Sequence, residues 1–360
     1  MHIETKWRTR KGDDSENCRR GNECAGYDTG TFLHLFITIG ILYAQIFGYA
    51  VSLLAFHILM LAVPIVCAIS FIFMPETPVY LIRNGKLDKV PKTFQFLRGK
   101  MYDFSHEVVI IEEQIAEDAK RPGFWVSMNT KASKKASLIC LMLMFYQQFS
   151  GVIPILFFLN EIFTSAGSSL EPQWCVIIVG IVEVGVSIVS SLVMDKFGRK
   201  ILLIVSSVTM AISAAVLGLF FTLKNSAIIE KDDIGKISFL SILSLMVFIA
   251  GFCFGIGPIP WMAPSELFAP EVTAKCSSAA STFNWLLAFF VSRFFLNVVD
   301  AIGSDATFYI FAGITATVPF FAWFLFPETK GKIFIQIKSE LEGKSPDEMS
   351  PDEISPQEIL

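Results

Sequence analysis

The tripeptide Pro-Glu-Thr occurs at residues 75–77, within PETPVYLIRNGK, and again at residues 327–329, within PETKGK. Each copy follows a long apolar segment and opens a polar stretch. Two copies in matching contexts indicate an internal repeat, and repeated bundles of helices are typical of membrane transporters. Six apolar segments lie between the copies, whereas two precede the first copy. The sequence therefore predicts the last two spans of one six-helix unit, followed by a whole second unit.

The composition is that of a membrane protein. Apolar residues make up 53% of the 360-residue chain, charged residues make up 17%, and the mean hydropathy is +0.57. A segment of about 20 apolar residues crosses the hydrocarbon core as a helix. The predicted fold class is an all-α polytopic bundle with about eight of twelve transmembrane helices. The spans are placed at 31–51, 54–74, 138–163, 173–194, 201–222, 237–260, 277–298 and 306–326.

These spans divide the chain into five parts. Residues 1–30 form a polar cytosolic leader without the apolar core of a signal peptide, and residues 31–74 form the last two helices of an N-terminal half. Residues 75–137 form a cytosolic linker with short helices, and residues 138–326 form a C-terminal half of six helices. The acidic, Pro-containing tail 327–360 is expected to be disordered and cytosolic. By this division the first four spans of a twelve-span protein are absent.

The basic residues predict the orientation in the lipid bilayer. Of the 29 Lys and Arg residues, Lys224, Lys231 and Lys236 lie in the loops of one side, and Arg293 lies inside a span. All the others lie in the alternate loops and in the two termini. Because cytosolic loops carry the excess of Lys and Arg, both termini are predicted to be cytosolic.

Other classes of protein are not indicated. The seven cysteines match neither a zinc spacing nor a disulfide framework, so no metal site is predicted. The sequence contains no nucleophile–base set and no nucleotide-binding loop, so we expect neither an enzyme nor a cofactor. A net charge of −4 without a basic bias argues against nucleic acid as a partner.

Two adjacent amides stand inside the third apolar segment, at Gln147 and Gln148 of the stretch QQFSG. A polar group in hydrocarbon needs a partner, because leaving it unpaired costs several kcal/mol. An amide both donates and accepts, which suits the hydroxyl groups of a sugar. The alternative is a close contact between helices, with Ser150 and Gly151 at the point of contact.

The sixth apolar segment ends in GIGPIPW, residues 255–261. Pro258 and Pro260 remove hydrogen bonds from the helix and are predicted to break it. Broken helices within a membrane line cavities or moving gates. Trp261 offers a flat apolar face and one N–H donor to a sugar, and its alternative role is that of an interfacial anchor.

A tight turn of sequence DKFGRK connects the fourth and fifth spans. Its charges oppose the helix dipoles, since an acid stands at a helix C-terminus and bases stand at the next N-terminus. We therefore expect a cytosolic charge network that holds one conformation closed. Its members are Asp195, Arg199, Lys200, Glu266 and Glu328.

These motifs together resemble the sugar porter family of the major facilitator superfamily, over about residues 30–332. The matching stretches, in order, are GILYAQIFG, PETPVYL, FQFLRGK, QQFSG, DKFGRK, GPIPW, PSELF, NWLLAF and PETKG. The PSELFAP and NWLLAF stretches are similar to those of insect-type facilitated trehalose or glucose transporters. The resemblance implies alternating-access transport of a sugar through a central cavity, in the plasma membrane.

The resemblance also implies the residues that contact the sugar. The paired glutamines of the family fall on Gln147 and Gln148, its cavity Trp falls on Trp261, and Asn284 stands in a matching motif. His34 replaces a Gln and Glu183 replaces an Asn, so both are candidate contacts. Other family polar groups are lost at Ile153, Cys253 and Ala288.

Because of Glu183, the sequence leaves open whether transport is coupled to protons. A carboxyl within a span is functional by default, so it could couple transport to protons, accept hydrogen bonds from a substrate, or pair with His34. It could also be a protonated group that bonds a neighbouring helix. Three hypotheses follow: a facilitative transporter of a hexose or trehalose, a proton-coupled symporter, and a gene fragment or a truncated non-transporting isoform, the latter associating with a full-length transporter.

Overall fold

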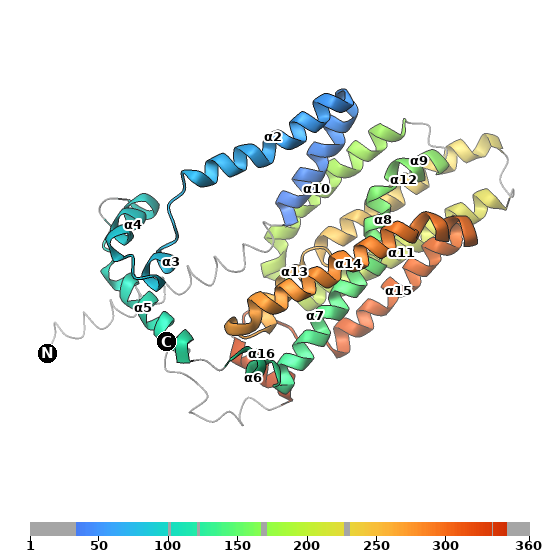
Figure 1. The fold of residues 1–360 in the computed structure, drawn as a ribbon. Helices are drawn as coiled ribbons and strands as arrows, with labels where there is room; N and C mark the ends of the chain where they lie inside the picture. The colour runs from blue at the N-terminus through green and yellow to red at the C-terminus, as the bar shows by residue number, and fades with distance from the viewer. Residues whose placement is uncertain are drawn as a thin grey trace, which may run out of the picture. The chain divides into compact units, whose positions relative to one another are not determined.

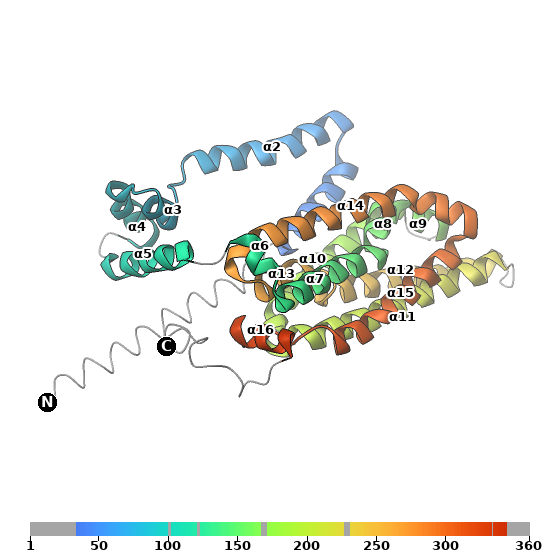
Figure 2. The ribbon, with the colours of Figure 1, turned by 60° about the horizontal axis from the view of Figure 1, so that its bottom comes forward.

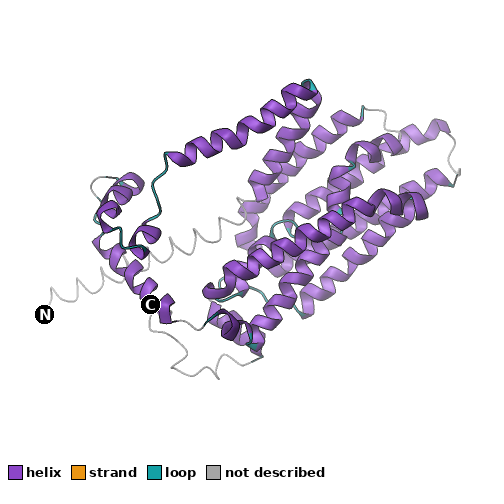
Figure 3. Cartoon of the chain, viewed as in Figure 1, coloured by secondary structure: helices purple, strands orange, loops and turns teal. Residues whose placement is uncertain are grey.

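A computed structural model describes residues 34–99, 102–120, 123–166, 171–226, 231–332 and 334–343. All the regular secondary structure of these residues is helical, which confirms the all-α prediction (Figure 3). The predicted leader, residues 1–30, lies outside the described residues, and so does most of the predicted tail.

The chain forms one helix after another (Figure 1). In order they are His34–Ala50, α2 (Leu53–Ile72), α3 (Pro78–Arg83), η1 (Leu87–Lys89), α4 (Val90–Arg98), α5 (Ser105–Lys120), α6 (Phe124–Met128), α7 (Lys131–Phe149), α8 (Val152–Phe157), α9 (Leu159–Ala166), α10 (Pro172–Phe197), α11 (Arg199–Asn225), α12 (Lys231–Phe254), α13 (Ile259–Leu267), α14 (Pro270–Ile302), α15 (Ser304–Phe324) and α16 (Phe334–Glu342).

Each predicted span coincides with helix. Within the described part of the chain, seven helical stretches are long and apolar enough to cross a membrane, and His34–Ala50 is a shorter apolar helix. The third predicted span is divided into α7, α8 and α9, and the sixth is divided into α12 and α13. The chain is therefore a multi-pass membrane protein whose third and sixth spans are interrupted.

The described residues form two compact units. One contains the residues up to Tyr49 together with those from Met128 onward, and the other is Ala50–Ser127. In the first unit α11 packs against both α12 and α15, α10 packs against α12, and α14 packs against α7 (Figure 2). This unit contains every candidate site residue.

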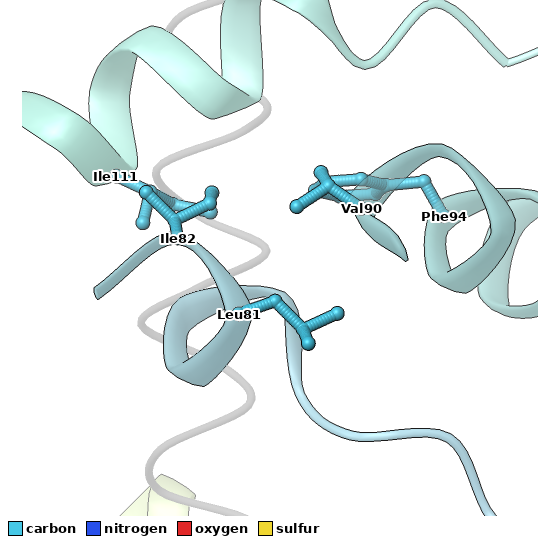
Figure 4. Packing of buried hydrophobic residues seen from close by; sticks show 5 residues of the cluster. All are labelled: Leu81, Ile82, Val90, Phe94 and Ile111. Atoms are coloured by element: carbon cyan, nitrogen blue, oxygen red, sulfur yellow. The ribbon is translucent and has the colours of Figure 1, made fainter. Parts of the chain in front are cut away.

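The second unit has a small hydrophobic core of its own. Its buried members come from α3, α4 and α5, and Figure 4 shows them. They are Leu81, Ile82, Val90, Phe94 and Ile111. Phe94 also stacks on Phe104, with 5.5 Å between ring centroids. Much of the predicted linker is therefore a packed helical module.

The predicted disordered tail requires a correction at residues 334–342. These residues form α16, whose Ile337 and Leu341 are buried one turn apart. The helix packs against α7 and α13, and Lys135 Nζ donates to the carbonyl oxygen of Leu341 at 3.3 Å. Apolar residues at helical spacing gave this short segment a face to bury. Residues 344–360 lie outside the described residues.

The interruption of the third span depends on Gly151. Its φ angle is +86°, a left-handed conformation that favours glycine, and a Cβ atom there would collide with the ring of Phe311 in α15. The close contact between helices that the sequence predicted for this stretch is therefore present at Gly151.

Replacing Gly151 with Ala is expected to destabilise the bundle. The strained φ angle costs about 1–3 kcal/mol, and the Phe311 ring must also shift. Thermal unfolding of the detergent-purified variant should occur well below that of the parent chain. Gly185→Ala is the matched control, because a Cβ atom there meets nothing within 4 Å. Equal unfolding temperatures for the two variants would contradict the expectation.

Candidate functional site

Three buried amides connect α7 with α14. Gln147, Gln148 and Asn284 are 3%, 2% and 1% exposed. The Nδ2 atom of Asn284 donates to Gln147 Oε1 at 2.8 Å, and Gln148 Nε2 donates to Asn284 Oδ1 at 2.8 Å. We call these three residues the amide cluster. The sequence indicated each residue separately, and the structure brings them together.

The amide cluster is also bonded to the interruption between α12 and α13. Gln147 Nε2 donates to the carbonyl oxygens of Ile256 at 3.0 Å and Gly257 at 2.8 Å. The predicted break is present here, since α12 ends at Phe254 and α13 begins directly after Pro258. The side chain of Gln147 thus satisfies carbonyl groups that a continuous helix would have bonded itself.

Ser206 of α11 holds the same interruption from another side. Its Oγ atom donates to the carbonyl oxygen of Gly251 at 2.7 Å and accepts from the N–H of Ile256 at 3.1 Å. The sequence did not single out Ser206, because a serine in an apolar helix usually bonds its own helix backbone. The proline pair was the only signal in the sequence that such a partner would be needed.

His34 lies against the interruption as well. Its ring centroid is 5.8 Å from that of Phe252. A Cβ atom at Gly257 would come within 3.0 Å of the imidazole, so the missing side chain at this position leaves the space that His34 occupies. His34 belongs to the apolar helix His34–Ala50, which therefore brings an imidazole to the break.

The helix His34–Ala50 also packs closely along α10. Tyr49 and Trp174 stack edge to face with 5.7 Å between their centroids. A Cβ atom at Gly180 would collide with Gln45 Oε1. Glu183 follows three residues after Gly180, and it is 1% exposed. Its backbone carbonyl oxygen accepts from the Cys253 thiol at 3.8 Å.

Several buried polar atoms around these helices lack a hydrogen-bond partner among the described residues. They are His34 Nε2, Gln45 Oε1, Gln148 Oε1, Glu183 Oε2 and Ser190 Oγ. An unsatisfied buried polar atom costs about 1–3 kcal/mol, so such a set is unusual unless a ligand or water completes it. The described residues contain no ion pair between Glu183 and His34, although the sequence left that pairing open.

Trp261 is the candidate sugar contact that follows the interruption in the chain. It lies in the first turn of α13, directly beyond the interruption, and its side chain is half-buried. Within the described part of the chain no hydrogen bond joins its indole to Gln147, Gln148 or Asn284. Because Trp261 lies next to the break, it remains a candidate contact for a ligand bound there.

The predicted charge network contains one buried ion pair. Arg199 Nε and Glu266 Oε1 are 3.2 Å apart, and both side chains are almost fully shielded from solvent. A buried pair of this kind is costly to break, because the remaining charge is left without a partner. The side chain of Asp195 lies outside the described residues.

Glu328 joins the network through backbone atoms. Its carboxylate accepts from the N–H groups of Arg199 at 3.0 Å and Lys200 at 3.2 Å, so it caps the N-terminus of α11. Gly198 has a φ angle of +86°, which favours glycine, and a Cβ atom there would lie 2.7 Å from Glu328 Oε2. The Lys200 ammonium instead donates to the Trp323 carbonyl oxygen at 2.8 Å.

Comparison with known proteins identifies the class to which this fold belongs. Residues 24–341 match the family model described as "Sugar (and other) transporter". The chain belongs to this family. The expected resemblance to sugar porters is confirmed.

Two relatives are facilitated trehalose transporters named Tret1. The one from Aedes aegypti is 34% identical over 311 residues, which cover 86% of this chain and 38% of that protein. The one from Polypedilum vanderplanki is 33% identical over 311 residues, which cover 86% of this chain and 61% of that protein. The chain thus spans less than two thirds of either relative.

A solved structure has the same fold. It is the major facilitator superfamily proton:xylose symporter XylE bound to 6-bromo-6-deoxy-D-glucose. The TM-score is 0.62 at 22% identity, and the match covers 88% of this chain and 67% of XylE. At this identity the likeness shows the fold alone.

Proposed function

We propose that the chain binds a sugar, either a hexose or trehalose, among its helices and carries it across the membrane by facilitative alternating access. The observation that carries the proposal is the amide cluster bonded to the broken helix. Amide groups donate and accept at once, as a polyol requires, and Gln148 Oε1 remains available to accept from a hydroxyl group. The names of the two Tret1 relatives make trehalose the first sugar to test.

The same proposal assigns roles to the neighbouring side chains. His34 and Glu183 each present one buried polar atom without a partner among the described residues, and these atoms would contact further hydroxyl groups. Trp261 would stack its flat face on the sugar ring. Because Gln147 donates to the carbonyl oxygens of Ile256 and Gly257, sugar binding at the amide cluster would alter the hydrogen bonds at the break. The interruption would then act as the moving part of a gate.

Uptake by the purified chain in proteoliposomes tests this function. Radiolabelled trehalose and glucose should enter faster than into protein-free vesicles, and unlabelled substrate should compete. Uptake of neither sugar by the chain alone would overturn the proposal. If uptake then appears only after co-reconstitution with a full-length family member, the non-transporting partner hypothesis replaces it.

The orientation and membrane form part of the proposal. The excess of Lys and Arg predicts that both termini lie in the cytosol, and the plasma membrane is the expected location. Epitope tags at the two ends should be stained in cells only after permeabilisation. Staining of intact cells at either tag would contradict this orientation.

Glu183 favours a second candidate function, proton-coupled symport. Its buried Oε2 atom has no partner among the described residues, so a proton could occupy it. For this candidate, an inward proton gradient should stimulate uptake by the parent chain. Glu183→Gln should abolish the stimulation, because an amide cannot exchange a proton, and Glu183→Asp should retain part of it. An unchanged pH profile in Glu183→Gln would exclude proton coupling through this residue.

A further inference from the structure

A pocket of about 390 Å³ lies along α14, where this helix packs against α8 (Figure 1). On α14 it runs from the residue after Asn284 of the amide cluster to Arg293, a rise of about 12 Å along the helix. At Ala288, within this stretch, the family resemblance implies a polar group that is lost in this chain. The pocket therefore adjoins the proposed sugar site. Its lining residues are Phe157, Trp285, Ala288, Phe289, Ser292 and Arg293.

Arg293 brings a positive charge into this pocket. It lies inside the predicted span 277–298, and it is half-buried. Among the described residues it forms no hydrogen bond and no ion pair, and neither Glu161 of α9 nor Asp300 of α14 pairs with it. A guanidinium stays charged, and a charge within a membrane span is costly unless it has a partner. Within the described part of the chain, Arg293 therefore lacks a counter-charge.

We propose that this pocket binds a hexuronate, a sugar that carries a carboxylate group, and that Arg293 pairs with the carboxylate. The inference rests on the proposed transport of a sugar and names a further substrate class for that site. An arginine presents its N–H donors in a planar fork, which matches a carboxylate through two parallel hydrogen bonds. One guanidinium and one carboxylate also cancel in charge, whereas a sugar phosphate would leave excess negative charge in apolar surroundings.

The other lining residues suit the ring of the sugar. Trp285, Phe289 and Phe157 are 61%, 61% and 65% exposed, and they offer aromatic faces for the C–H groups of a sugar ring. The Ser292 hydroxyl donates to a carbonyl oxygen of its own helix at 2.7 Å, so it can still accept from a sugar hydroxyl. Its single proton is used, so it has none to offer a carboxylate. Arg293 is thus the lining residue that selects for negative charge.

Uptake of glucuronate and glucose by the same proteoliposomes tests the inference, because the two sugars differ only at C6. The membrane potential is held at zero, so that the charge of glucuronate does not bias its entry. The parent chain should take up both sugars. In Arg293→Met the ratio of the glucuronate rate to the glucose rate should fall about tenfold or more. Arg293→Lys should retain part of the ratio, since lysine keeps the charge without the planar fork.

Asp300→Asn is the matched control. It removes the charge of another residue of α14, and this residue does not line the pocket. The ratio in this variant should equal that of the parent. Equal ratios in the parent and in Arg293→Met would overturn the inference and leave Arg293 as a side chain that extends toward the membrane surface.

Thermal unfolding in detergent gives a second measurement that does not need transport. Glucuronate should raise the unfolding temperature of the parent and of Asp300→Asn, because a ligand that binds the folded state stabilises it. The shift should be absent in Arg293→Met. If glucose enters the vesicles but glucuronate neither enters nor shifts the unfolding temperature, this inference is overturned and sugar transport stands. If neither sugar enters, the proposed transport fails, and the thermal shift alone decides the inference.

Discussion

Replacing Arg199 with Met is expected to destabilise the protein by about 3–5 kcal/mol, because it leaves the Glu266 carboxylate buried without its partner. The cap on α11 should survive, since Glu328 bonds the backbone N–H of residue 199 and not its side chain. The loss therefore belongs to the side chain of Arg199, whose Nη1 also donates to the Met194 carbonyl oxygen at 3.5 Å. Thermal unfolding of the purified variant in detergent measures it.

The matched control for this change is the double variant Arg199→Met with Glu266→Leu. Replacing both members of a buried ion pair with apolar residues is often neutral, so the double variant should recover most of the lost stability. A double variant as unstable as Arg199→Met would show that the unpaired carboxylate is not the cause. If the pair also holds the cytosolic side closed, as we propose, the double variant should still show increased labelling of cysteines introduced on that side.

Replacing Gln147 with Ala is expected to reduce sugar uptake by roughly tenfold or more, since three hydrogen bonds disappear together. The carbonyl oxygens of Ile256 and Gly257 lose their side-chain donor, and Asn284 Nδ2 loses its acceptor. Initial rates of uptake into proteoliposomes, corrected for the amount of protein reconstituted, measure the effect. This prediction rests on the proposed transport of a sugar.

Two controls separate the binding role of Gln147 from a general loss of folding. Gln148→Ala removes the side-chain hydrogen bond to Asn284 Oδ1, whereas Gln147→Ala removes three, so it should have a smaller effect on stability. Ser278→Ala changes a residue on the exposed face of α14, whose hydroxyl donates only to the Ala274 carbonyl oxygen of its own helix. That variant should transport like the parent. Normal uptake by folded Gln147→Ala would remove this residue from the proposed site.

The sequence predicted the spans well because apolar length is a local signal. The break before α13 was also predictable, since Pro258 cannot donate a backbone hydrogen bond. The interruption at Gly151 was expected only as a close contact, because nothing in the sequence shows that Phe311 lies against it. The short helix α16 was missed because its apolar residues are few and lie among charges.

The candidate site was predicted as separate residues rather than as an arrangement. Gln147 bonds Ile256 and Gly257, which are 109 and 110 residues away along the chain, and no local pattern encodes such partners. Resemblance to the family indicated Gln147, Gln148 and Asn284 individually. Their mutual hydrogen bonds and the support from Ser206 depend on how the helices pack.

The cap on α11 has a consequence for the biosynthesis of the chain. Glu328 lies 129 residues after Arg199, so a ribosome needs roughly 6 to 26 seconds to synthesise the intervening polypeptide. Throughout that interval the first N–H groups of α11 lack their carboxylate partner. The second Pro-Glu-Thr copy thus supplies the cap only after residue 328 has been synthesised, and a nascent chain released before that residue would retain an uncapped helix.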